Sequence, residues 1–342
     1  MALPASLPAA RTPDPMDAPP LRWGVLGTGW IAERFCDAMV RHTRQQVYAV
    51  GSRTLEGADG FADAFVARND GGTRAGGGTP PRPTAYGSYE QLLADPAVDI
   101  VYVATPHHLH LPHGRLALEA GKATVVEKPM GLSAAEVAEL EGLAAARGLF
   151  LMEALWSAYL PKFDVIRQLL DDGVLGTVHS VQADLGEHFG PGHRIMRADL
   201  AGGPRYDLLT YPLWFARWVL GDLEEISEVV TPAPAALSPD RVEGQIAVAA
   251  RSSSGGVASL FASILGDTPT TATVVGSEAT LHIDGPFYQP GGFTVRAHDG
   301  RELRYVEPRS GHEGLHHEAA AAAVALTHLT ELSELTDLTT LP

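Results

Sequence analysis

The segment Gly27-Thr28-Gly29-Trp30-Ile31-Ala32 constrains the fold more than any other, because it follows a short apolar run at Arg22–Leu26 and opens a helical pattern. In such a segment the first glycine permits a tight turn, the second lets a pyrophosphate approach the backbone, and the small last residue lets the helix pack closely on the sheet. The amino end of the helix then faces the phosphates. An ordinary glycine turn is the alternative, but the strand-turn-helix setting near the amino terminus argues against it. We therefore predict a Rossmann domain that binds a nicotinamide dinucleotide through Gly27, Thr28, Gly29, Trp30 and Ile31.

The end of the second predicted strand, Val47–Gly51, distinguishes between two dinucleotides. An NAD-binding domain usually places Asp or Glu here to hold the ribose hydroxyls, whereas an NADP-binding domain places a small or basic residue that accepts the 2′-phosphate. Ser52 can donate a hydrogen bond and Arg53 offers a guanidinium. Alternatively, Arg53 is a solvated loop cation, with acidic residues close by in the sequence. We predict NADP(H) in preference to NAD(H).

Short apolar runs alternate with Ala- and Leu-rich helical patterns over residues 21–150. Such alternation requires a parallel sheet with right-handed crossovers, so this part is expected to be an α/β Rossmann domain. Beyond residue 150 the alternation ends, and the pattern predicts a sheet-rich α+β domain over residues 151–326. The predicted strands are Arg22–Leu26, Val47–Gly51, Ile100–Ala104, Ala123–Glu127, Val178–Leu185, Gln245–Arg251, Val257–Ile264, Thr273–Val275 and Phe293–Arg296, and the first-domain helices are Ile31–Arg41, Gly57–Arg68, Pro112–Ala120 and Ala134–Arg147 with a capping box at Ser133 and Glu136.

Three segments stand outside this pattern. Residues 1–20 are rich in proline and lack a continuous apolar stretch, which predicts a disordered leader. Residues 69–83 have the Gly and Pro content of a flexible surface insertion. Residues 327–342 form a repetitive Thr/Leu/Glu tail, in which no helix can be recognised.

The charge balance and the lone cysteine limit the partners and the compartment. The formal net charge of −16 disfavours binding to nucleic acid or to an anionic membrane. No run approaches the roughly 18 apolar residues that a membrane helix needs, so a soluble protein is expected. Cys36 cannot form an internal disulfide, which mildly favours a reducing cytoplasm.

Histidines gather in two places, and neither predicts a metal centre. His107, His108, His110 and His113 crowd a short segment, but no cysteine and no obvious carboxylate completes a ligand set, so we predict no metal. A second group, at His312, His316 and His317, precedes an Ala-rich helical pattern and is assigned no chemistry.

Five ordered motifs give the chain a resemblance to a known family. Read in order over most of residues 21–215, they are GTGWIA, AYGSYEQLLADPAVDIVYVATPHHLH, ALEAGKATVVEKP, LFLMEALWSAYLP and DLLTYPL. The chain resembles the Gfo/Idh/MocA oxidoreductase family, in particular the branch with dimeric dihydrodiol dehydrogenase and NADP-dependent D-xylose 1-dehydrogenase. The combination of EKP with LMEALW makes the resemblance specific.

This resemblance implies a Rossmann domain followed by an open, mostly antiparallel sheet, and a homodimer that buries the open face. It implies that Lys128 lies beside the reacting carbon, ahead of a cis peptide bond to Pro129, and that Tyr211 is a catalytic tyrosine. The other implied roles are cofactor lining by Thr105, His107 and His110, a ribose contact by Glu127, and substrate contacts by Trp156 and Tyr159.

The chemistry of these residues is consistent with oxidation of a hydroxyl group. Hydride can leave a carbinol carbon only if the hydroxyl proton is removed, and Lys128 and Tyr211 can take it, with Asp207 orienting either group. Taken singly, Lys128 could instead be a surface lysine, Tyr211 a core-edge aromatic and Asp207 a helix cap.

Departures from the family pattern leave the substrate open. Ala158 stands where the branch has arginine, and Arg205 is expected to compensate as a substrate contact. Pro204 and Leu209 alter the approach to Tyr211. We predict an NADP-dependent dehydrogenase acting on a hydroxyl of a sugar, cyclitol or trans-dihydrodiol, or on its carbonyl; the alternative is a noncatalytic NADP-binding sensor.

Overall fold

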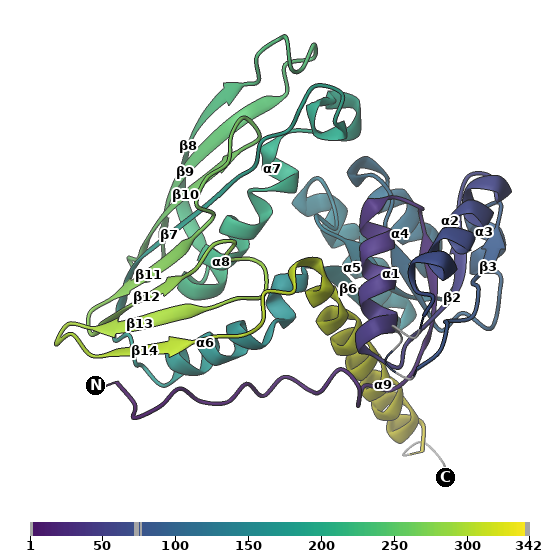
Figure 1. Ribbon diagram of the computed structural model, residues 1–342, viewed down its shortest axis with the longest axis horizontal. Coiled ribbons are helices and arrows are strands. Elements are labelled where there is room, and N and C mark those ends of the chain that lie inside the picture. Colours follow the sequence, from purple (N-terminus) through teal and green to yellow (C-terminus); the bar gives the residue numbers. More distant parts are fainter. Residues whose placement is uncertain (1–2, 72–74, 76, 339–342) are drawn as a thin grey trace. The chain divides into compact units, whose positions relative to one another are not determined.

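A computed structural model describes residues 3–71, 75 and 77–338 of the chain, with side chains described as far as Leu329. The chain forms two compact units, and Figure 1 labels most of their helices and strands. Of the described residues, those within 13–159 and 312–338 form the parallel-sheet unit, and those within 3–12 and 160–311 form the mixed-sheet unit. The predicted boundary at residue 326 therefore differs from the observed one, because the last helix folds with the first sheet.

The parallel-sheet unit is built on six parallel strands. Their order, β3-β2-β1-β4-β5-β6, is that of a dinucleotide-binding Rossmann sheet, which confirms the predicted fold class. Sequence analysis missed β3 and β6, because strands of three and four residues carry too little periodicity. The strands are β1 (Arg22–Leu26), β2 (Gln46–Gly51), β3 (Thr84–Tyr86), β4 (Ile100–Val103), β5 (Ala123–Glu127) and β6 (Leu151–Ala154).

The helix that follows Ser133 begins with a side-chain cap. The Ser133 hydroxyl accepts a hydrogen bond from the Glu136 amide at 3.3 Å, as the predicted capping box requires, although the Glu136 carboxylate reaches the Leu132 amide instead of that of Ser133. Gly148, at φ 63°, ends the same helix in the left-handed conformation. The helices are α1 (Trp30–His42), α2 (Leu55–Arg68), α3 (Tyr89–Leu93), α4 (His110–Glu119) and α5 (Ala134–Arg147).

Helix α9 (His316–Leu338) corrects the expectation for the carboxyl terminus. The Thr/Leu/Glu segment continues the Ala-rich helix as far as Leu338, since Ala, Leu and Glu favour helix. Buried alanines let α9 approach α1 and the turn η2 (Trp156–Tyr159) closely, and α9 lies beside α1 in Figure 1. Residues 339–342 of the predicted tail lie outside the described part.

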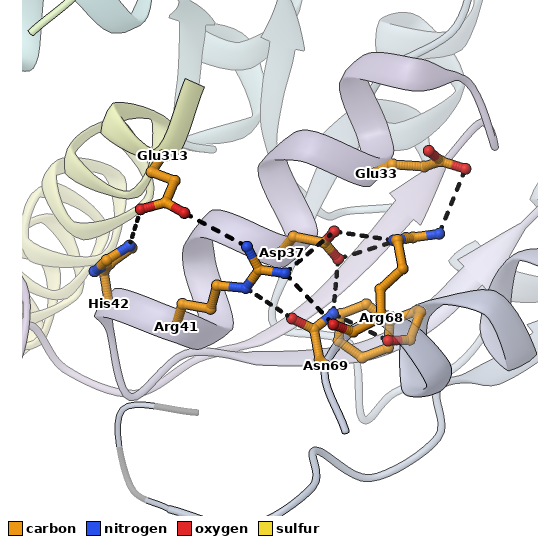
Figure 2. Close-up of polar contacts among 8 residues, drawn as sticks. Glu33, Asp37, Arg41, His42, Arg68, Asn69 and Glu313 are labelled. Carbon is orange, nitrogen blue, oxygen red and sulfur yellow. Dashed lines mark hydrogen bonds and ion pairs between the residues drawn. The ribbon is translucent and has the colours of Figure 1, made fainter. Parts of the chain in front are cut away.

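A polar network fixes α1 to the turn that precedes α9 (Figure 2). Buried Asp37 accepts hydrogen bonds from Arg68 Nε at 2.9 Å and from Asn69 Nδ2 at 2.7 Å. Arg41 Nε donates to Asn69 Oδ1 at 3.1 Å, and its Nη1 lies 3.5 Å from Glu313 in the turn η5 (Gly311–Leu315). The first residue of the predicted insertion is thus a buried part of the fold, whereas its residues 72–74 and 76 lie outside the description.

The mixed-sheet unit holds eight strands in the order β14-β13-β12-β11-β7-β10-β9-β8. Every neighbouring pair is antiparallel except β7 and β10, which confirms the mostly antiparallel sheet. Along β9, Ile246, Val248 and Ala250 are buried while the residues between them are exposed, so one face is packed and the other open. The strands are β7 (Val178–Gly186), β8 (Leu223–Pro232), β9 (Glu243–Ser252), β10 (Val257–Ser263), β11 (Ala272–Gly276), β12 (Ala279–Ile283), β13 (Phe293–Ala297) and β14 (Glu302–Tyr305), with helices α6 (Pro161–Asp171), α7 (Pro204–Asp207) and α8 (Thr210–Leu220).

The amino-terminal segment makes contacts that its composition does not predict. The Arg11 amide and guanidinium donate to the Asp164 carboxylate in α6 at 2.7 to 3.2 Å. Further along, Ala18 is buried against Ala320 and Ala323 of α9. Residues 3–20 form no helix or strand, yet they contribute to the packing of both units.

Candidate dinucleotide and proton-transfer site

The turn after β1 has the backbone that a dinucleotide requires. Gly27 has φ +108°, and a Cβ on it would lie 2.6 Å from the Ala104 carbonyl oxygen, so only glycine fits. A Cβ on Gly29 would meet no atom within 4 Å, which leaves open space at the amino end of α1. Ala32 is fully buried between helix and sheet, as predicted. This arrangement suits a phosphate group placed on the helix amino terminus.

The end of β2 presents an exposed cation. Arg53 is exposed, and within the described part of the chain its guanidinium makes no ion pair or hydrogen bond. Asp59, an acidic neighbour in the sequence, pairs with Arg82 at 2.8 Å instead. Ser52 is held beside Arg53 by a 3.1 Å hydrogen bond from its amide to the Tyr86 carbonyl. Arg53 is therefore available to a ligand anion.

The segment after β4 holds a buried histidine. The His110 imidazole is buried, and its two nitrogens lie 2.7 Å from the Pro129 and Thr105 carbonyl oxygens. The ring joins the end of β4 to the segment that follows Lys128, and its role in lining a cofactor stays a prediction. Burial lowers the pKa of His110, so the neutral ring can donate to only one of the two carbonyls. His107 lies against it, with ring centroids 5.6 Å apart.

The backbone around Lys128 is held by two carboxylates. Glu127 accepts from the Lys128 amide at 3.0 Å and from the Tyr102 hydroxyl at 2.5 Å. The predicted cis bond between Lys128 and Pro129 is present. Glu153 of the LMEALW motif accepts from the Met130 amide at 2.8 Å, and burial raises its pKa. The position of Lys128 at the end of β5 is thus fixed on both sides.

A second buried acid, Glu318 of α9, was missed by sequence analysis. It is fully buried, and neither carboxyl oxygen has a hydrogen-bond partner in the described part of the chain. Burial, followed by the charge of Glu127, raises its pKa well above the ordinary value. A single Glu at the start of an Ala-rich helix resembles an ordinary first-turn residue, so the sequence carries no signal that Glu318 is buried near Glu127.

Aromatic rings from three distant segments meet in the parallel-sheet unit. The His312 ring stacks on Trp156 with centroids 5.4 Å apart and meets Trp30 edge-on at 4.7 Å. Trp156 is almost completely buried, whereas Trp30 is exposed at the start of α1. Tyr159, in the same turn as Trp156, has its pKa raised by burial. Sequence analysis gave His312 no role, because nothing local links it to the other two rings.

The residues predicted from the second domain lie in the mixed-sheet unit. Tyr211, near the start of α8, is buried against Tyr288 with ring centroids 4.5 Å apart. Asp207 accepts from Arg194 at 2.8 Å. Pro204 occupies the first turn of α7, where it costs no helical hydrogen bond, and Leu209 has φ −63°, so glycine is not required there. Both departures are accommodated without strain.

Arg205 is paired with acids inside the mixed-sheet unit. All three guanidinium nitrogens hydrogen-bond to the carboxylates of Glu228 and Glu243, at 2.8 to 3.1 Å. These bonds join α7 to β8 and β9. The predicted contact of Arg205 with substrate, in place of an arginine at Ala158, stays a prediction.

Two features of other classes of protein are absent from the described residues. These residues contain no group of three or more His, Cys, Asp or Glu side chains placed to hold a metal ion. They also contain no helix that is both long and apolar enough to cross a bilayer.

The order of the parallel strands, the glycine turn and the lysine at the end of β5 define a dinucleotide-binding oxidoreductase. A family model described as "Oxidoreductase family, NAD-binding Rossmann fold" matches residues 21–155, and the GFO/IDH/MocA C-terminal domain matches residues 163–282. The chain therefore belongs to the Gfo/Idh/MocA oxidoreductase family.

Named relatives agree with this assignment. D-xylose 1-dehydrogenase (NADP(+)) of Hypocrea jecorina is 35% identical over 303 residues, covering 80% of this chain and 75% of the relative. Trans-1,2-dihydrobenzene-1,2-diol dehydrogenase of Mus musculus is 34% identical over 267 residues, covering 77% of this chain and 74% of the relative. A 3-ketoreductase from Actinomadura kijaniata, solved with NADP and TDP-benzene, is 28% identical over 91% of each chain with a TM-score of 0.75.

Proposed function

We propose that the chain is an NADP(H)-dependent oxidoreductase that transfers hydride between a nicotinamide and a hydroxyl-bearing carbon of a sugar, cyclitol or trans-dihydrodiol. The observation that carries the cofactor choice is Arg53, an exposed cation at the end of β2 without an acidic partner among the described residues. The relatives that are named as NADP-dependent or solved with NADP support the same choice.

The residues present fit such a cofactor. The open space at Gly29 admits a pyrophosphate to the first turn of α1, and Ser52 and Arg53 would hold the 2′-phosphate. Thr105 and His107 follow β4 at the same edge of the sheet, where a Rossmann domain binds its ligand. When bound, the nicotinamide supplies the acceptor or donor of the hydride.

Lys128 handles the proton in this proposal. Its backbone is fixed by Glu127 on one side and by the Met130 contact to Glu153 on the other, which suits a group that must meet a substrate oxygen within hydrogen-bond distance. For oxidation the amine takes the hydroxyl proton, and for reduction the ammonium returns it. The assisting role of Tyr211 and the orienting role of Asp207 rest on the family resemblance.

Titration with NADPH and NADH tests the cofactor choice. Arg53→Ala should weaken NADPH binding about 10- to 100-fold and change the affinity for NADH by no more than about twofold. The reason is that Arg53 would contact only the 2′-phosphate, which NADH lacks. Arg44→Ala is a matched control, since Arg44 is an exposed arginine before the opposite end of β2. Tighter binding of NADH than of NADPH by the parent protein would overturn the choice.

Turnover tests the catalytic proposal. The parent is offered D-xylose, other aldoses and trans-diols with NADP⁺, and NADPH formation is followed by its absorbance. Lys128→Met should abolish turnover while NADPH still binds, and Tyr211→Phe should lower kcat. NADPH binding without turnover of any polyol or carbonyl partner would instead favour the noncatalytic sensor.

We further propose that the protein is a cytoplasmic homodimer that buries the open face of the mixed sheet. That face carries small and apolar side chains, among them Val229, Ala247 and Phe261, on adjacent strands. Buried, unpaired Cys36 is compatible with a reducing compartment. Light scattering should give twice the mass of the chain, and a monomer at micromolar concentration would contradict the proposal.

A further inference from the structure

The His312 side chain is fixed in place by its neighbours. One face of the imidazole stacks on Trp156 at an interplanar angle of 20°, and Trp30 meets it edge-on at 80°. Trp30 is itself covered by the Arg34 guanidinium, 5.5 Å from its ring centroid. The ring therefore has little freedom to rotate away.

The backbone next to His312 is equally restrained. Glu313 pairs with Arg41 at 3.5 Å and with His42 at 3.1 Å, so the turn η5 is attached to the carboxyl end of α1 (Figure 2). This preorganisation means that little conformational entropy is lost if His312 binds a ligand.

The hydrogen-bonding capacity of this imidazole is unused. Within the described part of the chain, no group donates to or accepts from either ring nitrogen of His312, although the side chain is partly buried. Burial, reinforced by the Arg34 and Lys128 cations, lowers the pKa of His312 to about 4, so the ring is neutral at physiological pH. A neutral imidazole offers one donor and one acceptor, which is the complement of a hydroxyl group.

The neighbours of His312 indicate which hydroxyl group of a substrate it would bind. His312 lies near enough to Lys128 to feel its charge, and its side chain is only partly buried. Lys128 is already assigned to the hydroxyl group that reacts. A second hydroxyl on the adjacent carbon is common to sugars and trans-dihydrodiols, the substrate classes proposed above.

We propose that His312 is a specificity-determining residue that binds the hydroxyl group vicinal to the one oxidised, so that the enzyme selects 1,2-diols over mono-alcohols. This inference rests on the proposed function. His312 touches substrate and not the reacting hydrogen, so its loss should raise KM more than it lowers kcat.

Three variants distinguish the contribution of the aromatic ring from that of its two nitrogens. His312→Phe keeps an aromatic ring between the two tryptophans and removes both nitrogens, whereas His312→Gln keeps a donor and an acceptor and removes the ring. His298→Phe is the matched control, because His298 is exposed in the turn between β13 and β14.

The assay compares D-glucose with 2-deoxy-D-glucose and trans-cyclohexane-1,2-diol with cyclohexanol, using NADP⁺ throughout. In the parent, kcat/KM should favour the member of each pair that carries a hydroxyl group next to the one oxidised. His312→Phe should raise KM for that member about 3- to 10-fold and leave KM for the other member unchanged, as expected for the loss of one neutral hydrogen bond. His312→Gln should recover part of that loss, and the affinity for NADPH should not change.

Two results would overturn the inference while leaving the proposed function intact. One is an equal rise in KM for both members of a pair, which would mean that the His312 ring only packs against its neighbours. The other is weaker binding of NADPH with substrate selectivity unchanged, which would place His312 on the cofactor. If the parent turns over neither pair nor any other polyol, the proposed function fails and this inference fails with it.

Discussion

Replacing Glu318 by glutamine should stabilise the fold at neutral pH, and the gain should grow as the pH rises. Glu318 and Glu127 lie in the same buried region, and they differ in their hydrogen-bond donors. Glu127 accepts hydrogen bonds from the Tyr102 hydroxyl and the Lys128 amide. The described residues offer Glu318 no donor, and its pKa is raised. We therefore expect Glu318 to be a neutral carboxylic acid in the folded state.

The sign of the pH dependence follows from this raised pKa. A group that holds its proton when folded and releases it on unfolding contributes stability below its unfolded pKa of about 4.5, and that contribution is lost as the pH rises. The loss is about 1.4 kcal/mol for each pH unit between the unfolded-state and the folded-state pKa. Glutamine has the shape of the neutral acid and cannot ionise.

Urea unfolding followed by circular dichroism, at pH values from 5 to 8, measures this difference. The free energy of unfolding of Glu318→Gln should exceed that of the parent by an amount that increases steadily with pH. Glu141→Gln, at an exposed position in α5, serves as the control and should give no such trend. A difference between parent and Glu318→Gln that is constant over this range would show that Glu318 is ionised in the fold, and the reasoning would be wrong.

Two further predictions concern the mixed-sheet unit. Burial lowers the pKa of Lys162 to about 7, so above this pH the unfolded state binds one proton more than the folded state. The free energy of unfolding of the parent should therefore rise from pH 7 toward pH 10, by up to about 1.4 kcal/mol per pH unit. Lys162→Met should lack this rise in the same unfolding assay. Arg205→Ala leaves Glu228 and Glu243 without their shared cation, and should lower the free energy of unfolding by about 1 to 2 kcal/mol with KM unchanged. A raised KM at unchanged stability would instead support the predicted substrate contact of Arg205.

The parallel sheet could be predicted from the sequence because its signals are local. The run Ala123–Glu127 is apolar enough to be a buried strand, and it is wholly buried in β5. The glycine turn was predictable for the same reason, since the φ of +108° at Gly27 is a property of one residue in a short segment. Elements without a regular hydrophobic period were not predicted. Strand β8 mixes acidic and apolar residues in an exposed strand, and β6 has only four residues.

Roles that depend on contacts with residues far apart in the sequence were predicted less accurately. Arg205 looked like a free cation beside a catalytic tyrosine, yet the carboxylates that neutralise it come from β8 and β9. His110 has a buried ring because two backbone carbonyls meet there, one of them beyond β5. In each case the sequence names the residue type, and folding decides which groups face it.

The sequence by itself determined the Rossmann unit, the glycine turn and the cation at the end of β2, because hydrophobic period and backbone conformation are encoded over a few neighbouring residues. The tertiary structure decided that α9 folds with the first sheet, that Glu318 is buried near Glu127, and that His312 lies between Trp30 and Trp156. These contacts join segments far apart in the chain. Their energy comes from burial and from charges brought close together, and neither leaves a period in the sequence.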